Sequence, residues 1–325
     1  MRAPLRLWVL LLALLAGGCA QMVPQTIALR TGWPAGVAQS TEIAGVPFFP
    51  QEEYECGPAA LATVLDFSGA HTTPEALVPQ VYLPGRHGSL QLELLAASRR
   101  HDRVPYVLAP RYADLLREVA AGHPVLVLQD VGLVGTQWHY AVVNGFDYPS
   151  GTVLLRSGRR ARQEMPFTAF ERSWMRSGYW AMVAMPPDRI PATATEDAWM
   201  NAVLAMARVA DPAPAATAFA TALQRWPDNQ AAAVGLANKL YARGDLEQAA
   251  ATLREARRRH PASAIVANNL AQVLSDQRRQ REALALIDPL ARDAGNPFAA
   301  EIRSTRELIE RRLKQQASGA AAATH

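Results

Sequence analysis

The sequence predicts an α+β domain followed by an all-α repeat domain. Between Val46 and Met185, patterns typical of helices come first and patterns typical of strands follow them, which is an α+β order. After Pro186 and Pro187 the strand patterns vanish and alanine dominates. From there a period of 34 residues recurs, which indicates a repeat architecture built from helix pairs.

Four short helices are predicted in the first part of the α+β domain. Apolar residues recur at helical spacing in segments 57–67 and 89–100. Thr73 and Pro74 start another helix, since Thr can cap a first turn and Pro fits its first position. Segment 113–121 is the fourth helix.

The strands predicted in this domain cover 46–49, 104–109, 125–128, 139–146, 152–155 and 179–185. The run 125–128 is continuously apolar and is therefore expected to be buried. Residues 147–151 read Asp-Tyr-Pro-Ser-Gly and predict a hairpin turn. A short helix over 166–174 precedes the closing strand.

The second half of the chain carries three helix-pair units. Matching positions 34 residues apart include Ala215, Ala249 and Ala283, and also Phe219, Leu253 and Ile287. This pattern resembles the tetratricopeptide repeat. A generic alanine-rich bundle is the alternative, but six registers agree across the units. Gly244 provides a turn between helices in the middle unit, and the other two units lack this glycine.

The N-terminus predicts export. Arg2 and Arg6 flank the start of an apolar stretch, Leu5 to Leu15, which is too short to span a bilayer. Small residues then precede Cys19, so the segment resembles a bacterial lipoprotein signal in which Cys19 is the lipidated residue. An ordinary cleaved signal with an unmodified cysteine is the alternative. The resemblance implies a periplasm-facing membrane lipoprotein, and Ala20 fits sorting to an outer membrane.

Composition argues against several other classes of function. The net charge is only +4, and the arginine clusters at 156–162 and 257–259 are expected to be solvated faces rather than nucleic-acid sites. No spacing of Cys, His and carboxylates predicts a metal site, and no glycine-rich phosphate loop follows a strand. We therefore expect no metal, no other cofactor and no nucleic-acid partner.

Cys56 is the residue most typical of chemistry. The chain has two cysteines, and lipidation of Cys19 would leave Cys56 without a disulfide partner. Cys56 precedes Gly57 and a predicted helix start, where the helix dipole favours a thiolate. A buried small hydrophobe is the alternative for this residue.

Two further residues complete a possible catalytic set. His139 starts a strong predicted strand, which is a rigid platform for a base, although a structural strand-end histidine is the alternative. Gln51 lies five residues before the thiol, and its amide could hold an oxyanion, unless it is an ordinary loop residue. Tyr54 and Trp138 are expected to line the cleft.

These residues in this order resemble papain-like cysteine peptidases, and above all the bacteriocin-processing group (family C-39). The matching segments are Gln51, Cys56 to Leu61 (Cys-Gly-Pro-Ala-Ala-Leu) and 139–147 (His-Tyr-Ala-Val-Val-Asn-Gly-Phe-Asp), within a span of about 46–185. The resemblance implies a papain-like fold. It also implies that Cys56 is the nucleophile, His139 the general base and acid, and Gln51 the oxyanion donor.

The third catalytic member is missing from its expected place. Asp147 lies about 27 Å along the strand from His139, at the hairpin end. The family's acid should lie on the returning strand, where the chain reads Leu-Arg-Ser-Gly at 155–158. Ser157 is therefore the candidate that would orient His139.

The expected divisions follow from these observations. They are a signal peptide at 1–19, a tether at 20–44, a cysteine peptidase-like domain at 45–186, a linker at 187–192, three tetratricopeptide-like repeats at 193–295, a capping helix at 296–316 and a disordered tail at 317–325.

The leading hypothesis is a membrane-anchored periplasmic cysteine peptidase that hydrolyses peptide bonds and recruits a partner or substrate protein through its repeats. The alternative is a catalytically degenerate binding lipoprotein that acts through the repeats. A third reading is acyl transfer or amide hydrolysis of a non-protein substrate with the same nucleophile.

Overall fold

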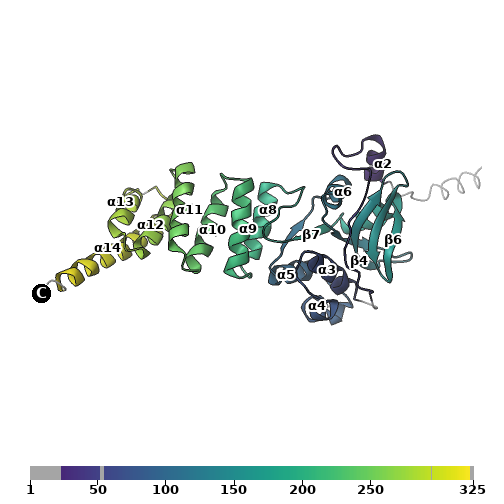
Figure 1. Cartoon of the computed structure of the whole chain (residues 1–325), viewed down its shortest axis with the longest axis horizontal. Coiled ribbons are helices and arrows are strands. Elements are labelled where there is room, and N and C mark those ends of the chain that lie inside the picture. The colour runs from purple at the N-terminus through teal and green to yellow at the C-terminus, as the bar shows by residue number, and fades with distance from the viewer. Residues whose placement is uncertain (1–22, 52–54, 294, 323–325) are drawn as a thin grey trace, which may run out of the picture.

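The computed structural model describes residues 23–51, 55–293 and 295–322, with side chains as far as residue 318. The predicted signal peptide with Cys19, and also Tyr54, lie outside the described residues. Figure 1 shows an elongated molecule, with a compact α+β domain at one end and a row of helices at the other. No helix in the described ranges combines the length and apolarity needed to cross a membrane.

A seven-stranded antiparallel sheet forms the centre of the first domain. Its order is β2-β7-β3-β4-β5-β6, and β1 pairs with the far end of β4. The strands are β1 Ser40–Glu42, β2 Val104–Val107, β3 Val125–Asp130, β4 Trp138–Asp147, β5 Thr152–Ser157, β6 Arg160–Pro166 and β7 Ala181–Met185. As predicted, the run at the start of β3 is buried on both faces.

Helices cover both faces of the sheet. They are α2 Pro24–Thr31, α3 Cys56–Phe67, α4 Pro74–Val81, α5 Gln91–Arg100, α6 Tyr112–Ala120 and α7 Phe167–Trp174, with short 3-10 turns η1 Pro84–Arg86 and η2 Met175–Ser177. Because side chains alternate along a strand, Leu126 and Val142 pack with α3, α4 and α5, whereas Val127 and Ala141 pack with α6 and α7. The result is a three-layer domain, and its α+β class is the one that the sequence predicts.

The pairing of β4 with β5 leaves the start of β4 open on one side. The paired residues run from Asp147 and Thr152 to Val142 and Arg156, with a register shift near Gly145. The last residues of β5 then turn toward β6, with a second shift before Ser157. The backbone of β4 before Val142 therefore has no β5 partner, and a cleft opens there.

The predicted tether at 20–44 is wrong for its described part. Residues from Pro24 form α2, and the N-terminus of this helix is held by buried Glu171, whose carboxylate accepts the N–H groups of Gln25 at 3.0 Å and Thr26 at 2.6 Å. β1 then joins the sheet. The first domain thus includes residues that the polar, turn-rich sequence assigned to a linker.

Two strand assignments also differ from prediction. The segment 46–49 forms no strand, since Pro47 has no N–H for a ladder and the carbonyl of Val46 accepts hydrogen bonds from Arg156. Strand β6 was missed, because it is an exposed edge strand with two arginines and little apolar alternation.

The second domain consists of helix pairs followed by a long final helix. The pairs are α8 Glu196–Met206 with α9 Pro212–Arg225, α10 Gln230–Ala242 with α11 Leu246–Arg259, and α12 Ala264–Asp276 with α13 Gln280–Ala291. First helices start 34 residues apart, and so do second helices. The final helix, α14 Ala299–Ala322, extends past the predicted end at 316, so the start of the predicted disordered tail is helical.

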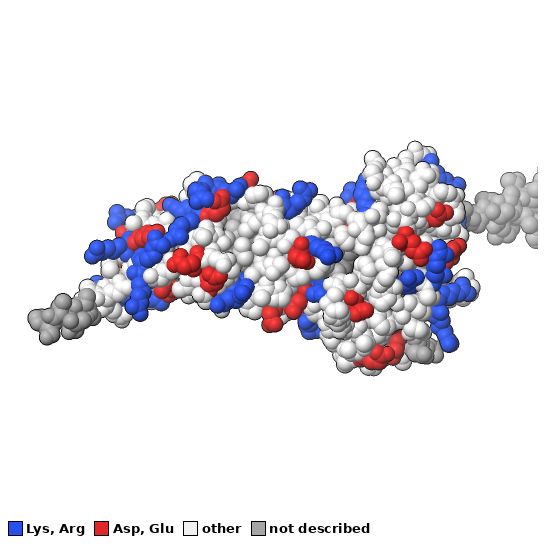
Figure 2. Space-filling model, viewed as in Figure 1, with Lys and Arg blue, Asp and Glu red and all other residues white. Residues whose placement is uncertain are grey.

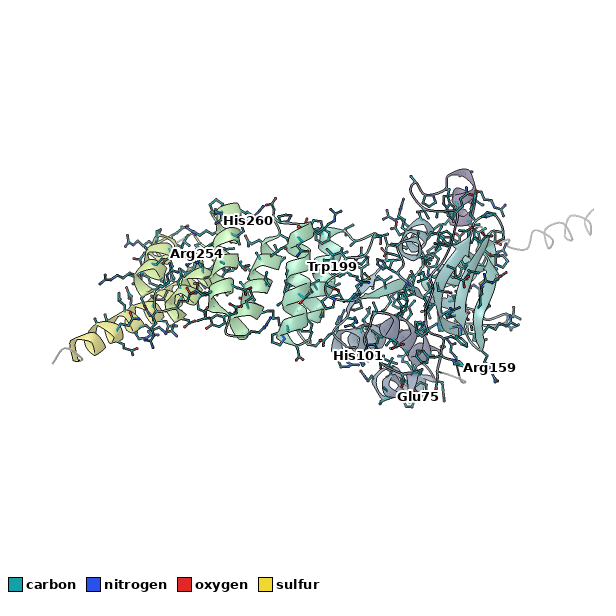
Figure 3. The ribbon with its side chains drawn as sticks, viewed as in Figure 1. Glu75, His101, Arg159, Trp199, Arg254 and His260 are labelled. Carbon is teal, nitrogen blue, oxygen red and sulfur yellow. The ribbon has the colours of Figure 1, made fainter. Side chains whose placement is uncertain are left out.

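The first helix pair shares the hydrophobic core of the α+β domain, whereas the later repeats form a core of their own. Trp199 of α8 is fully buried, and its ring centroid lies 6.3 Å from that of Tyr106 on β2. Figure 3 places Trp199 where the helix row meets the sheet domain. The first helix pair therefore packs as part of the α+β domain and not only as a repeat.

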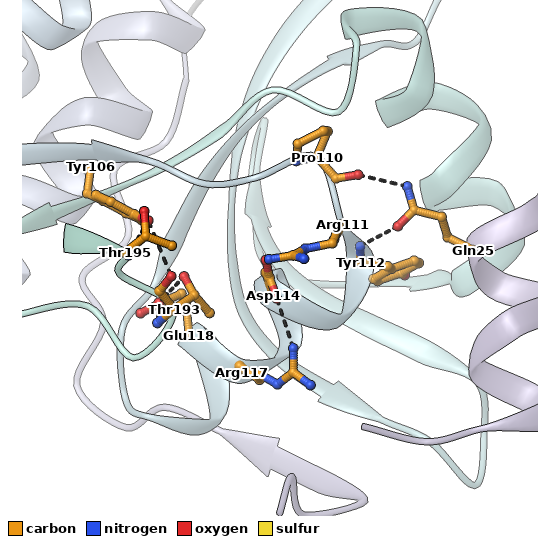
Figure 4. Close-up of polar contacts among 10 residues, drawn as sticks. All are labelled: Gln25, Tyr106, Pro110, Arg111, Tyr112, Asp114, Arg117, Glu118, Thr193 and Thr195. Carbon is orange, nitrogen blue, oxygen red and sulfur yellow. Dashed lines mark hydrogen bonds and ion pairs between the residues drawn. The ribbon is translucent and has the colours of Figure 1, made fainter. Parts of the chain in front are cut away.

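A buried carboxylate fastens the connecting segment between the domains. Glu118 of α6 accepts the N–H and the hydroxyl of Thr193 at 2.6 Å each (Figure 4). It also accepts the N–H of Ala192 at 3.2 Å, and His123 Nδ1 lies 2.7 Å from its carboxylate. The predicted linker at 187–192 connects the domains, but its end is held against the first one. The relative orientation of the two domains is thus built into the fold.

Charged side chains are spread over the molecule in both signs. Figure 2 shows Lys and Arg grouped over the C-terminal helices, with Asp and Glu among them. In the cluster at 257–259, Arg258 pairs with Glu255, and Arg259 pairs with Glu255 and Asp228.

Candidate active site

Cys56 lies at the first helical position of α3, on the floor of a cleft of about 680 Å³. The cleft is lined by Gln51, Cys56, Arg86, His87, Gly88, Ser89, Leu90, Gln137, Trp138, His139, Tyr140 and Gly158. Three residues chosen from the sequence, Cys56, His139 and Gln51, thus meet in one cleft. They come from the start of a helix, the start of a strand and the loop before the helix.

The glycine after the thiol is explained by close packing. A Cβ atom on Gly57 would lie 2.3 Å from Ser89 Oγ and 3.7 Å from the ring of Tyr140. The first turn of α3 therefore packs closely between Ser89, which follows η1, and the side chain of Tyr140 on β4. This close approach fixes the position of the neighbouring thiol relative to β4.

Two opposing effects act on the Cys56 thiol. Burial raises the pKa of the thiol above its ordinary value, and it outweighs hydrogen bonding to the backbones of Tyr140, Gly57 and Cys56 itself, which lowers the pKa. Backbone hydrogen bonds at the helix start favour the thiolate, as expected, but they are the smaller of the two effects on the pKa of Cys56. The net direction favours the protonated thiol over the thiolate.

His139 is held by a hydroxyl on the neighbouring strand. Its Nε2 lies 2.9 Å from Oγ of Ser157, which is itself only 8% exposed. If Nε2 carries the ring hydrogen and donates it to Ser157, Nδ1 has a free lone pair and can accept a proton. Ser157 thus lies where the sequence places the group that orients His139.

Burial acts on His139 in the direction that favours its neutral form. It lowers the pKa of His139, and among the described residues no carboxylate opposes that effect. Both side chains line one cleft, but no hydrogen bond joins Cys56 Sγ to the ring among the contacts of the described residues. Since burial favours the neutral form of each group, proton transfer during attack is favoured over transfer before it.

Gln51 is fixed by the turn between β5 and β6. Its backbone N–H donates to the carbonyl of Gly158 at 3.0 Å, and the N–H of Gly158 donates to Gln51 Oε1 at 3.1 Å. This contact assigns the amide oxygen to the Gly158 side and leaves Nε2 toward the cleft, 3.5 Å from the carbonyl of Tyr140. An amide N–H held in this way is available to an oxyanion.

Asp147, the carboxylate on the same strand as His139, lies at the opposite end of β4 from that histidine. Its side chain accepts the N–H of Ser150 at 2.9 Å and bonds the hydroxyl of Ser40. The side chain of Ser150, the hydroxyl of Ser40 and the N–H of Ser150, in that order, lower the pKa of Asp147. It stabilises the hairpin turn. This position agrees with the expectation from the sequence that Asp147 lies far along the strand from His139.

The cleft also contains residues that sequence reasoning missed. Arg86 to Leu90 form one wall, and His87 adopts a left-handed backbone with φ of 47°. The Oγ atom of Ser89 is buried and has no hydrogen-bond partner among the residues that the structure describes. This wall could have been predicted from Gly85 and Gly88, because glycines at such spacing indicate a tight loop. Trp138 lines the cleft as expected and is 51% exposed.

Comparison with known families identifies both domains. Residues 43–182 match the Peptidase_C39 like family, and residues 210–273 match the tetratricopeptide repeat. The chain therefore carries a C39-like peptidase domain followed by tetratricopeptide repeats. Among curated proteins no significant match was found.

Two solved structures align with the first domain. One is a double glycine motif protease from an AMS/PCAT transporter in complex with its leader peptide, at 22% identity, covering 44% of this chain and 93% of that one with a TM-score of 0.34. The other is a putative C39-like peptidase from Bacillus anthracis, at 16% identity, covering 46% of this chain and 98% of that one with a TM-score of 0.38.

Proposed function

We propose that the C39-like domain of this chain is a cysteine peptidase that hydrolyses peptide bonds, with Cys56 as nucleophile and His139 as base and acid. The observation that carries the proposal is the cleft itself. It brings a helix-start thiol, an imidazole oriented by Ser157 and the amide of Gln51 to one place. These are the parts that acyl transfer to a thiol requires.

The chemistry follows from the protonation states. As Cys56 Sγ attacks the substrate carbonyl carbon, its proton moves to Nδ1 of His139. The carbonyl oxygen becomes an oxyanion, which accepts hydrogen bonds from Gln51 Nε2 and from the Cys56 N–H, a donor without an intrahelical acceptor at this position. Collapse breaks the C–N bond, and His139 returns the proton to the leaving amine. Water then attacks the thioester, and the thiol is restored.

The repeats support a recruiting role. Tetratricopeptide repeats are protein-binding modules, and here the first helix pair is packed into the peptidase core. We propose that a partner or substrate protein bound by the repeats is presented to the same molecule. We also propose that residues 1–19 direct export and that Cys19 carries the lipid that anchors the protein to the membrane, facing the periplasm and sorted to the outer membrane.

A second candidate function has one observation in its favour. Burial raises the pKa of Cys56 and, in the described part of the chain, no carboxylate supports His139, so the pair is less activated than a thiolate–imidazolium pair. This favours a degenerate peptidase domain that serves as a binding scaffold. The third reading, acyl transfer to an acceptor other than water, uses the same first step.

The proposal is tested by incubating the full chain with a proteome-derived peptide mixture and identifying new peptide termini by mass spectrometry. Wild-type protein should generate a consistent set of termini that Cys56→Ala and His139→Ala both abolish. If the wild-type and Cys56→Ala samples are indistinguishable, the peptidase proposal fails and the scaffold reading replaces it. Transfer of an added amine to the new C-termini would indicate acyl transfer. The mass of the N-terminal peptide from cells tests lipidation of Cys19.

A further inference from the structure

Helix α2 is fixed to the peptidase domain from its start. Val23, which precedes it, is already buried. Besides the two bonds to the buried carboxylate described above, the side chain of Gln25 donates to the carbonyl of Pro110 at 3.1 Å and accepts the N–H of Tyr112 (Figure 4). Contacts with α6 and α7 complete this support. The position of α2 on the domain is therefore rigidly defined.

The distance from Cys19 to this helix is short. Cys19 precedes Val23 by four residues. Since a chain extends by at most about 3.6 Å per residue, this stretch spans no more than about 14 Å. If Cys19 carries a lipid, α2 lies within that distance of the lipid headgroups. A surface that faces the bilayer must therefore lie on and beside α2.

The outward side of α2 is apolar. Its exposed residues share one stripe of the helix by their spacing, and they are Pro24, Ile27, Ala28 and Thr31. Between positions 24 and 39 the chain has one charged residue, Arg30, which is also exposed. In Figure 2 the lobe that carries α2 in Figure 1 is largely white. An apolar stripe with a cation beside it is typical of a helix that lies in a membrane interface.

A hollow beside α2 continues this surface. Its volume is about 420 Å³, and it is lined by Thr26 and Arg30, by the hairpin residues 148–151 and by residues 166–168 at the start of α7. Arg30 is the only charged side chain among these lining residues, and it has no ion pair within the described part of the chain. A guanidinium that lines an open hollow can bind the phosphate of a lipid headgroup through parallel hydrogen bonds.

The cleft lies on the far side of the domain from α2. Trp33, just after α2, packs on Tyr148 at the hairpin end of β4, with 4.5 Å between the ring centroids. His139 stands near the other end of β4, about 27 Å along the strand from the hairpin. The sheet also separates the two, because Leu29 of α2 packs in the core with α6 and α7, whereas Cys56 packs in the core on the other face. Figure 1 agrees, with α2 at the top of the domain and α3 toward the bottom.

We propose that the exposed stripe of α2, Arg30 and the hollow beside it dock on the phospholipid bilayer that holds the lipid of Cys19, and that the cleft thereby faces away from the membrane. The stripe lies among the headgroups, and Arg30 binds a lipid phosphate in the hollow. The cleft then stands roughly 20–30 Å from the lipid surface, given the length of β4. Its substrates are polypeptide segments in the aqueous compartment and not bonds at the membrane surface.

A bilayer is favoured over a protein partner on this surface. About 14 Å of chain is shorter than the diameter of a small folded domain, about 30 Å, so no such domain fits between α2 and the headgroups. The docking surface rests on the proposed lipidation of Cys19. It does not depend on peptidase chemistry.

The test measures which end of the domain contacts lipid. The full chain carrying Cys56→Ala is expressed with its own N-terminus and reconstituted in vesicles of phosphatidylethanolamine and phosphatidylglycerol. A bimane label on Ala28→Cys reports on the stripe, and the same label on Leu133→Cys, at a fully exposed leucine between β3 and β4, reports on the opposite end. Lipids brominated next to the headgroup quench a bimane that lies against them. The mass of the N-terminal peptide is measured on the same sample.

Two variants of the Ala28→Cys protein test the contacts. Ile27→Asp puts a charge in the stripe, and Leu92→Asp, at an exposed leucine of α5, is its matched control. Arg30→Glu reverses the cation, and Arg303→Glu, at an exposed arginine of α14, is the control for that change. Quenching at position 28 should be lost with Ile27→Asp and weakened with Arg30→Glu, most of all in vesicles rich in phosphatidylglycerol. Both controls should be quenched like the parent.

The label at position 28 should be quenched and the label at position 133 should not. Quenching at 133 alone, or equal quenching at both positions, would overturn the proposed orientation. If the N-terminal peptide carries lipid but position 28 is not quenched, the anchor stands and only the docking surface fails. If the peptide carries no lipid, the lipidation proposal fails and the docking surface falls with it. Because every measurement uses Cys56→Ala, a wild-type protein that cleaves nothing would count against the peptidase proposal alone.

Discussion

Nε2 of His139 lies 2.9 Å from Oγ of Ser157, so a hydroxyl stands where a carboxylate or an amide orients the imidazole in comparable hydrolytic sites. A hydroxyl can fix the ring and its tautomer. It cannot supply the negative charge that stabilises an imidazolium. This contact therefore does not offset burial, which lowers the pKa of His139, and it suggests how the site could be improved.

Replacing Ser157 by Asp should therefore raise peptidase activity. A carboxylate beside Nε2 would raise the pKa of His139 and favour transfer of the thiol proton, with a gain in kcat/KM on the order of tenfold or more. Ser157→Asn should orient the imidazole of His139 without adding a charge, so its activity should be near that of the wild type. Ser157→Ala should lose activity. The measurement is the rate of appearance of new peptide termini. Equal rates for the Asp and Ala variants would show that Ser157 does not orient the base.

The pH dependence of thiol alkylation should report the neutral state of the site. Because burial raises the pKa of Cys56, the thiolate appears only as pH rises through a value above the ordinary thiol pKa of about 8.5. Iodoacetamide should thus label folded protein slowly at neutral pH and faster toward alkaline pH, and it should label urea-unfolded protein faster at neutral pH. Mass spectrometry of the Cys56 peptide gives the rates. An alkylation midpoint below the ordinary value would indicate a thiolate and contradict this account.

As pH falls, peptidase activity should be lost only at a low pH. The imidazole must be neutral to accept the thiol proton, and burial lowers the pKa of His139. Activity should persist as pH falls past the ordinary histidine pKa of about 6.5 and decline only below it. In Ser157→Asp the acid limb of kcat/KM should move to higher pH, because the new carboxylate stabilises the imidazolium. An acid limb at the same pH in both proteins would contradict the proposed contact.

The sequence predicted the parts of the fold whose signals are local. Helix α3 and the start of α4 follow from apolar spacing and from capping by Thr73, whose side chain accepts the N–H of Ala76 in the structure. The helix pairs follow from the 34-residue period. Strand β6 and helix α2 were missed, because an exposed edge strand and a helix capped by the distant Glu171 carry no local pattern.

The site was predictable in its members but not in its electrostatics. Cys56, His139 and Gln51, which line one cleft, could be chosen from residue type and spacing, and Ser157 from the strand on which the resembling family carries its acid. The balance between burial and backbone hydrogen bonds at Cys56 depends on how deeply the cleft closes over the thiol. That depth is set by contacts of Ser89 and Tyr140, which come from other segments of the chain.

Gly57→Ala should destabilise the protein and misplace the thiol. The added methyl group would meet Ser89 at 2.3 Å from Oγ and 2.6 Å from Cβ, so the first turn of α3 or the neighbouring loop must move. The expected cost is about 1–3 kcal/mol in the free energy of unfolding, measured by urea denaturation. Combining it with Ser89→Gly should recover most of the loss, because Ser89 Oγ has no hydrogen-bond partner to lose. No recovery in the double variant would show that the strain lies elsewhere.

Arg278→Gly should stabilise the repeats. Gly244 ends its helix with φ of 81°, and Arg278, the residue 34 positions later, adopts φ of 61° at the same place in its unit. A side chain in the left-handed region costs roughly 1–2 kcal/mol, part of which glycine returns through its larger unfolded-state entropy. The net gain in the free energy of unfolding should be about 1 kcal/mol. Arg278→Ala keeps the Cβ atom and should give no such gain, so equal stabilisation by both substitutions would rule out backbone strain as the cause.

The peptidase domain should not fold well without the first helix pair. Trp199, Val203 and Met206 of α8 are fully buried in the same core as Tyr106 and the β2–β7 edge of the sheet. A chain that ends at Pro187 would expose this apolar surface and lose the Thr193 contacts of buried Glu118. A chain that ends at Trp226, after α9, keeps both and should unfold in one cooperative thermal transition. Circular dichroism melts of the two chains test this, and a shorter chain with an equal Tm would show that the shared core does not support the sheet.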